Sequence, residues 1–200
     1  MRTFVLRARK GSVKADKLLA GIGAGEHSEI IAHTLANCFY FSNGIRSDVE
    51  VYVVLDSAAD FPRTLKFSAN QGLSFPGFHE QAILGVVADA LDKGSRITKD
   101  ATQIVAPGIE ISGFGFDTLM KKLQDERPVY FLDKKGQDIR TVALTEEGGV
   151  FLLSDHLPMP KNSLQVLERR GGIKISLGKK ILFASQCVVL VHNELDRRFG

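Results

Sequence analysis

Hydrophobic residues along the chain follow two periods, the alternation typical of β-strands and the three-to-four-residue spacing of α-helices. Arg2–Arg9 alternates apolar and polar residues, which predicts a strand with Phe4 and Leu6 on one face. Within Ile104–Ile111 an extended segment is interrupted by Pro107 and Gly108, residues that central strands disfavour. Short apolar or β-branched runs predict the remaining strands at Val49–Leu55, Thr64–Ala69, Pro128–Leu132, Val150–Leu153 and Ile173–Leu177.

Helical spacing recurs in four other segments. One helix starts at Glu26, with Gly44 placed as its C-terminal cap, and another covers His79–Lys93 and stops at Gly94. The apolar stripe of the first is formed by Ile30, Ile31, Leu35, Cys38 and Phe39.

A third helix is predicted at Asp117–Glu126, with Asp117 as its N-cap. The pattern of Ser185–Arg198 suits a strand or a buried helix, and we favour a helix because Ser185 can cap it and its last turn is charged. Residues 10–25, which contain LLAGIGAG, are expected to form a loop. Strands separated by helices predict an α/β fold with a mainly parallel sheet and helices on both faces.

Chain length and composition indicate one domain spanning residues 1–200, large enough to bury its own core. The longest apolar run, Cys187–Val191, is too short to cross a membrane, and the basic N-terminus lacks the apolar core of a signal peptide. Cys38 and Cys187 form no disulfide framework or zinc pattern. We therefore expect a reduced, cytoplasmic protein without a membrane partner.

The net charge of +3 is mild, but its distribution is uneven. Basic residues crowd the first segment, opposed only by Asp16, which is compatible with RNA contact or with a solvated surface. These residues are Arg2, Arg7, Arg9, Lys10, Lys14 and Lys17.

Several local patterns resemble catalytic motifs without their required context. The glycines of GIGAG (21–25) and GFG (113–115) lack the strand and the spacing of a dinucleotide-binding turn, so we interpret them as loop glycines. The chain has no Walker loop and no paired metal-ligand spacing, so no metal site is predicted. The five histidines are scattered along the sequence.

Three turn-forming segments follow three apolar strands in the last third of the chain. They are LDKKG, SDHLPMPK and SLGKKILFASQC. In parallel α/β sheets, ligands bind outside the carboxyl ends of the strands, where loops leave backbone amides and carbonyls free. Three such loops predict a pocket suited to a flat purine.

These segments resemble the archaeal tRNA pseudouridine N1-methyltransferase family of the SPOUT superfamily. The similarity covers nearly the whole chain through MRTFVLRARK, SNGIRSD, SDH and the SLG…LFASQC block in order. The resemblance implies a SPOUT fold with a trefoil knot, a feature rare in proteins, within about residues 128–200. It also implies a homodimer that uses S-adenosylmethionine as cofactor and RNA, specifically tRNA, as substrate. No DNA partner is expected. Two departures, Ser154 in place of the usual glycine and Lys179 in place of proline, suit a bacterial-type branch.

Carried over position by position, the resemblance implies a cofactor site in the three loops. Cys187 is also compatible with a purely apolar role facing the sheet. We do not expect it to act as a nucleophile, because N1 of pseudouridine can attack the methyl group directly. The implied cofactor residues are Leu132, Ser154, Ser176, Leu177, Gly178, Leu182 and Cys187.

Arg46 and Asp48 of SNGIRSD are the candidate catalytic residues, for binding a phosphate or uracil oxygen and for accepting or orienting the N1 proton. They are equally compatible with a loop ion pair. Asp155 and His156 form a second candidate pair in a cofactor loop, where His156 could titrate near neutrality or merely cap the turn. The alternative function is a knotted RNA-binding or ribosome-associated protein that no longer transfers methyl groups efficiently.

Overall fold

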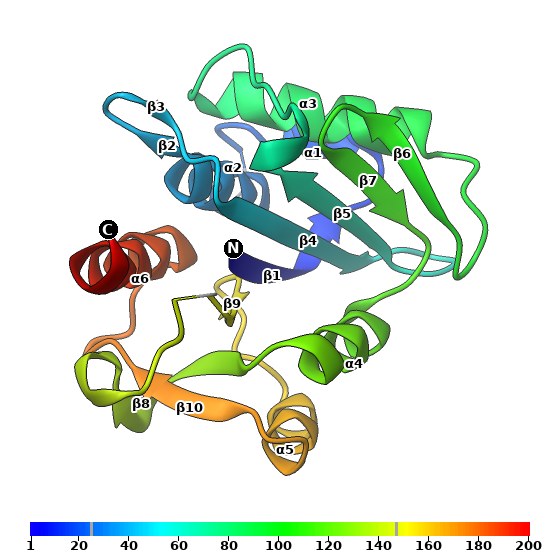
Figure 1. The fold of residues 1–200 in the computed structure, drawn as a ribbon. Coiled ribbons are helices and arrows are strands. Elements are labelled where there is room, and N and C mark those ends of the chain that lie inside the picture. Colours follow the sequence, from blue (N-terminus) through cyan, green and yellow to red (C-terminus); the bar gives the residue numbers. More distant parts are fainter. Residues whose placement is uncertain (25, 147) are drawn as a thin grey trace.

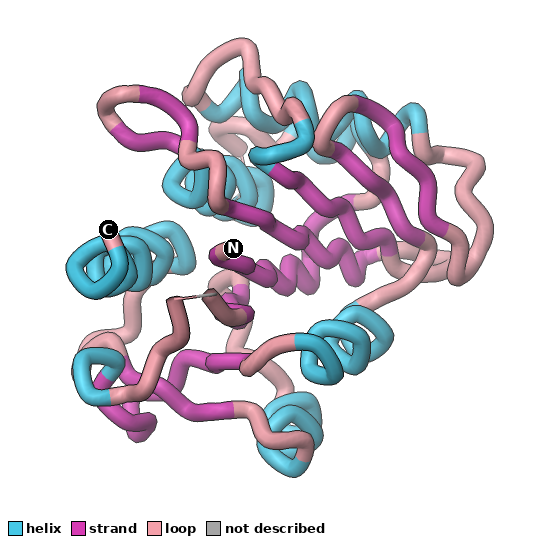
Figure 2. The backbone as a smooth tube through the Cα atoms, viewed as in Figure 1, coloured by secondary structure: helices cyan, strands magenta, loops and turns pink. Residues whose placement is uncertain are grey.

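A computed structural model describes residues 1–24, 26–146 and 148–200. One sheet of eight strands runs through the molecule in the order β10-β8-β9-β1-β4-β5-β7-β6, with helices on both faces (Figure 1). The strands of this sheet are β1 (Arg2–Ser12), β4 (Val49–Ser57), β5 (Arg63–Ser68), β6 (Thr102–Ala106), β7 (Ile109–Ser112), β8 (Val129–Asp138), β9 (Val150–Ser154) and β10 (Ile173–Ser176). The helices are α1 (Ala15–Ala20), α2 (Glu26–Phe39), α3 (Glu80–Lys93), α4 (Phe116–Glu126), α5 (Lys161–Arg169) and α6 (Ala184–Phe199), and Figure 2 shows how loops join them to the strands.

The sheet has a parallel half and an antiparallel half. Strands β10, β8, β9, β1 and β4 pair in parallel, with Phe4 opposite both Val51 and Phe151. Strands β4, β5, β7 and β6 pair antiparallel. The connection between β4 and β5 is too short for the crossover that a parallel pair would need. The predicted mainly parallel arrangement is therefore confirmed, with an antiparallel extension on one side.

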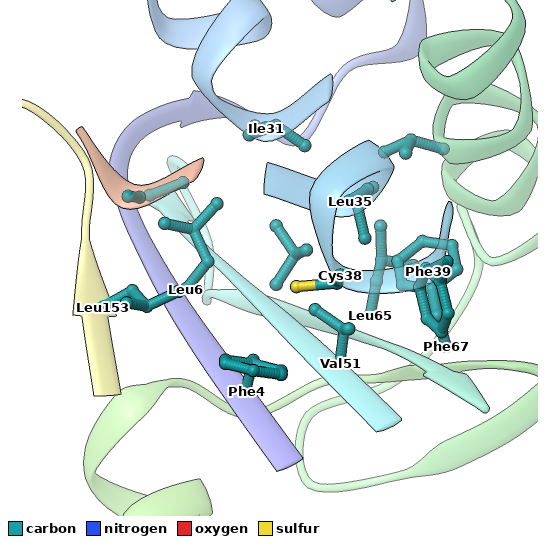
Figure 3. Close-up of a cluster of buried hydrophobic side chains, with 14 of the residues drawn as sticks. Phe4, Leu6, Ile31, Leu35, Cys38, Phe39, Val51, Leu65, Phe67 and Leu153 are labelled. Atoms are coloured by element: carbon teal, nitrogen blue, oxygen red, sulfur yellow. The ribbon is translucent and has the colours of Figure 1, made fainter. Parts of the chain in front are cut away.

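Two buried clusters fill the two faces of the sheet. Because successive side chains of a strand point in opposite directions, Phe4 and Leu6 belong to the larger cluster under α1, α2, α3 and α6 (Figure 3), whereas Val5 belongs to the smaller cluster under α4 and α5. The prediction of helices on both faces is confirmed.

Local chemistry corrects some of the expected boundaries in the first half of the chain. Residues 10–25 are not a continuous loop, since β1 extends to Ser12 and α1 follows it with Leu18 buried; Gly25 lies outside the described residues. Gly44 does not cap α2. That helix ends at Phe39, whose carbonyl accepts a hydrogen bond from the Arg46 N–H, and the chain then forms the hairpin of β2 (Tyr40–Phe41) and β3 (Gly44–Ile45).

The expected segment Ile104–Ile111 is two strands, β6 and β7, which turn at Pro107 and Gly108. Gly108 has a φ of 68° and lies against the Ser68 carbonyl, where a Cβ would approach the backbone to 2.7 Å. Glycine is therefore required at this turn.

Helix ends in the second half also differ from expectation. Gly115, not Asp117, is the N-cap of α4, and Phe183, not Ser185, is the N-cap of α6. At Phe183 the backbone N–H donates to the Gln186 side chain at 3.0 Å, which satisfies the helix start without a serine. Helix α5 was not predicted at all; it begins directly after Pro160, where the sequence pattern is dominated by turn residues.

Candidate functional site

A cavity of about 450 Å³ opens at the carboxyl ends of β8, β9 and β10, where the three predicted turn segments meet. Its volume lies within the range of small-molecule sites. All of the expected cofactor residues except Ser176 line it: Leu132, Ser154, Leu177, Gly178, Leu182 and Cys187.

The first wall of the cavity is an excursion of β8. β10 pairs with β8 at Lys174–Phe131 and then at Ile175–Gln137, so residues 132–136 leave the ladder between two consecutive positions of β10. A Cβ on Gly136 would lie 2.6 Å from the Ile175 backbone, so glycine lets the excursion return to the sheet. The LDKKG segment is thereby presented to the cavity with Leu132, Asp133 and Lys134 among its lining residues.

The second wall is the turn after β9, fixed by the buried carboxylate of Asp155. One oxygen of Asp155 accepts a hydrogen bond from the Arg9 N–H at 2.8 Å, and the other accepts from the Leu157 N–H at 2.9 Å. Carboxylates that bridge backbone donors in this way hold tight turns. The turn places Ser154 and His156 on the cavity wall.

The third wall is the segment between β10 and α6. The Ser176 hydroxyl accepts from the Gly178 N–H at 3.2 Å, and Gly178 has a φ of 125°. Ser176 does not line the cavity itself but shapes the turn that carries Leu177 and Gly178 to it.

Cys187 lies where α6 closes this wall. Its thiol is buried, and burial raises its pKa to about 11. The thiol therefore stays protonated near neutral pH and is a poor nucleophile. Cys187 both packs in the core and lines the cavity, so the two alternatives left open by the sequence are compatible.

The lining of the cavity suits S-adenosylmethionine. Apolar side chains, among them Leu132 and Leu182, surround the space, and charged groups of both signs from Asp133, Lys134 and Lys180 border it. A purine needs an apolar slot edged by backbone hydrogen-bonding groups, while the methionine part carries an ammonium, a carboxylate and a sulfonium. The residues present fit this cofactor.

Arg46 and Asp48 lie away from the cavity in the same chain. They precede β4, at the amino ends of the parallel strands, whereas the cavity lies at the carboxyl ends. The two terminal guanidinium nitrogens of Arg46 donate to the Asp196 carboxylate, at 3.0 and 2.6 Å. Arg2 forms ion pairs with both Asp48, at 2.9 Å, and Asp196, at 2.6 Å. The candidate catalytic pair is therefore part of a four-residue ion network on the start of β1, the loop before β4 and the end of α6.

Buried His192 lies under this network. Its Nε2 lies 3.0 Å from the Cys38 carbonyl, and its Nδ1 lies 3.1 Å from the Arg2 guanidinium. Burial, together with the positive charges of Arg46 and Arg2, lowers the pKa of His192 to about 4. The imidazole is therefore neutral at physiological pH, donating to the carbonyl and accepting from Arg2.

Folding is expected to become less favourable as the pH falls from about 6.5 to about 4, because the unfolded chain protonates His192 in this window and the folded chain does not. The loss amounts to roughly 3 kcal/mol, at about 1.4 kcal/mol per pKa unit. Urea unfolding at a series of pH values measures it. His192→Gln should flatten the dependence in this window, and an unchanged slope in that variant would rule out His192 as its source.

Two cavity neighbours were missed by sequence reasoning. Ile30 lines the cavity from α2, and His27, one turn earlier, packs its ring against that of His156 with centroids 4.5 Å apart. Ile30 was interpreted as part of the apolar stripe of the helix, and His27 as one of several scattered histidines. No spacing rule connects them to residues 154–156.

Comparisons with known proteins identify the family of the chain. Residues 1–199 match the family described as "Putative SAM-dependent RNA methyltransferase". The chain belongs to this family. The methyltransferase is 46% identical to a "Putative pseudouridine methyltransferase" of Photobacterium profundum, over 98% of both chains. A protein of the same description from Shewanella baltica is 47% identical, again over 98% of both chains.

The fold of the methyltransferase is also found among solved structures. "Crystal structure of Archaeoglobus Fulgidus Nep1 bound to S-adenosylhomocysteine" superposes with a TM-score of 0.66 at 15% identity, covering 98% of this chain and 97% of that one. This likeness shows that the two chains share one fold over nearly their whole length. Among the described helices of the methyltransferase, none has the length and apolar character needed to span a bilayer.

Proposed function

We propose that this methyltransferase transfers the methyl group of S-adenosylmethionine to N1 of a pseudouridine in tRNA. The observation that carries the proposal is the cavity built by three loops at the carboxyl ends of β8, β9 and β10, in a chain of an RNA methyltransferase family. The names of its relatives support pseudouridine as the target nucleotide.

The cavity residues bind and orient the methyl donor in this proposal. When bound, S-adenosylmethionine supplies an electrophilic methyl carbon on a sulfonium. Apolar side chains and the turn backbones of the three loops hold the purine and exclude water, and Ser176 keeps the third turn in place. The residues assigned to cofactor binding are Leu132, Ser154, Ser176, Leu177, Gly178, Leu182 and Cys187.

The nucleotide must be held with N1 about 3 Å from the methyl carbon, and the N1 proton must reach an acceptor. We assign Arg46 to a phosphate or uracil oxygen and Asp48 to the N1 proton. Since both lie at the far end of the parallel strands from the cavity of their own chain, the assignment requires that they serve the cavity of a second copy.

A homodimer provides that arrangement. Apolar side chains are exposed on α6 and at its start, with Val189 and Leu190 on the helix and Phe183 65% exposed at its N-cap. Phe41 and Ile45 of the neighbouring β2–β3 hairpin are exposed as well. A second copy that covers this surface would bury apolar area and bring the Arg46 network next to a cavity, since α6 carries residues of both.

The trefoil knot within residues 128–200 and a cytoplasmic location complete the proposal. The knot is supported by the strand order, in which the chain after β9 crosses back past β8 to form β10 at the edge of the sheet. The cytoplasmic location is supported by Cys38 and Cys187, which are both free thiols.

Titration calorimetry with S-adenosylmethionine and S-adenosylhomocysteine tests the cofactor site. We expect saturable binding at about one ligand per chain, and an affinity at least about tenfold lower for Gly178→Leu, because the new side chain enters the cavity. Gly171→Leu is the matched control. Gly171 also has a positive φ, 87°, with open space around a Cβ, but it does not line the cavity.

Both variants should lose stability to backbone strain, by about 1–2 kcal/mol for Gly171→Leu, and only Gly178→Leu should lose affinity. Absence of binding by the unmodified protein at millimolar ligand would contradict the enzyme proposal and favour an RNA-binding protein. Equal losses of affinity in both variants would remove Gly178 from the site.

A further inference from the structure

Three potential metal ligands meet beside the cofactor cavity. His27 from the first turn of α2 and Asp155 and His156 from the turn after β9 each offer one ligand atom, and these atoms all lie within 4.8 Å of one another. In a tetrahedral zinc site with bonds of about 2.0–2.2 Å, ligand atoms lie about 3.4 Å apart. Small side-chain rotations therefore suffice to bring the three groups onto one ion.

His27 supplies an independent indication of a ligand. Its Nδ1 is buried and has no hydrogen-bond partner among the described residues. An unpaired buried ring nitrogen is costly, and coordination of a cation is one of the few ways to satisfy it. The His156 ring lies against the His27 ring, with centroids 4.5 Å apart, so the two imidazoles are already adjacent.

Asp155 is already oriented as a metal-binding carboxylate would be. It is buried, and among the described residues one oxygen accepts a hydrogen bond from the N–H of Arg9 and the other from the N–H of Leu157. Each oxygen therefore keeps a second lone pair. Ligating carboxylates in proteins are typically held by such outer hydrogen bonds, which fix their direction.

We propose that His27, Asp155 and His156 form a site for a first-row transition-metal ion of the Zn²⁺ type. Two imidazoles and one carboxylate suit such ions, whereas Mg²⁺ and Ca²⁺ prefer oxygen ligands. The remaining coordination positions face the cavity side, since Asp155 and His156 line the cavity. No sequence pattern predicts the site, because His27 is remote from the other two ligands along the chain.

The ion links the start of α2 to the loop that forms the second wall of the cofactor cavity. Binding of the ion thereby fixes that wall, and by linkage it raises both the thermal stability and the affinity for the methyl donor. The site itself does not depend on which RNA is methylated.

Titration of the EDTA-treated full-length protein with Co²⁺, followed by visible absorption, tests the site. We expect the intense d–d bands of a four- or five-coordinate ion, saturating at about one Co²⁺ per chain and displaced by Zn²⁺. His27→Gln and His156→Gln should each lower the Co²⁺ affinity at least about tenfold. His156 is exposed, so its variant should fold normally.

His33→Gln is the matched control, because His33 lies on the same helix, is exposed and pairs with Glu80 at 2.7 Å. It should bind Co²⁺ like the unmodified protein. Absence of d–d bands in the unmodified protein, or an equal loss of affinity in His33→Gln, would overturn the proposal. The measurement needs neither methyl donor nor RNA, so its failure is distinct from failure of the proposed methyl transfer.

Discussion

Replacing Arg46 with glutamine is expected to lower the rate of methyl transfer to RNA by about 10²–10³-fold, the usual cost of removing a group that stabilises developing charge. The affinity for S-adenosylmethionine should stay unchanged, since Arg46 is assigned to the nucleotide and not to the methyl donor. Single-turnover transfer of a radiolabelled methyl group, with calorimetry of donor binding in parallel, measures both quantities.

Asp196→Asn separates the catalytic role of Arg46 from its structural one. This variant removes the carboxylate that pairs with Arg46 at 2.6 Å but keeps the guanidinium. We expect it to retain transfer within about tenfold of the unmodified rate. If Asp196→Asn is as inactive as Arg46→Gln, the arginine acts by holding the ion network together and does not touch the nucleotide.

Replacing Phe4 with alanine is expected to destabilise the fold by about 3–5 kcal/mol. Phe4 is fully buried on β1, in the parallel half of the sheet (Figure 3). Its ring centroid lies 5.7 Å from that of Phe151 and 5.0 Å from that of His192. Truncation leaves a cavity between β1, β9 and α6 that the surrounding elements cannot close. Urea unfolding at fixed protein concentration measures the loss.

Phe78→Ala is the control for this prediction, because Phe78 is 73% exposed. Its loss should stay below about 1 kcal/mol. A loss in Phe4→Ala no larger than that of Phe78→Ala would show that the sheet–α6 contact contributes little to stability.

Most elements could be predicted from the sequence because their patterns are strong and local. β1 carries Phe4 and Leu6 at strand spacing on one face, and α3 has apolar residues at helical spacing and ends at Gly94. Two of the failures lie at helix ends, where one short-range hydrogen bond decides the boundary. The hairpin after α2 is closed by the Arg46 N–H on the Phe39 carbonyl, and the start of α6 is capped by the Gln186 side chain on the Phe183 N–H.

The site likewise combines features that a local sequence pattern predicts with features that only the packing of the elements decides. Three turns after three strands predict a ligand site at one sheet edge, because the carboxyl ends of parallel strands are adjacent in space. Arg46 and Asp48 lie at the opposite end of the parallel strands because they precede β4, whereas the cavity segments follow their strands. Their ion pairs with Asp196 and Arg2 depend on the packing of α6, which no local pattern shows. His27 belongs to the site neighbourhood through the packing of α2 on the sheet, which the sequence does not encode as a motif.

The most direct test of the central claim is mass spectrometry of RNA nucleosides after incubation of the purified protein with S-adenosylmethionine. Two tRNA substrates of one sequence are compared, one carrying pseudouridine and one carrying only uridine. We expect N1-methylpseudouridine in the first and no methylation in the second. Absence of any methylated nucleoside in both, although the protein binds the methyl donor, would contradict the proposed reaction.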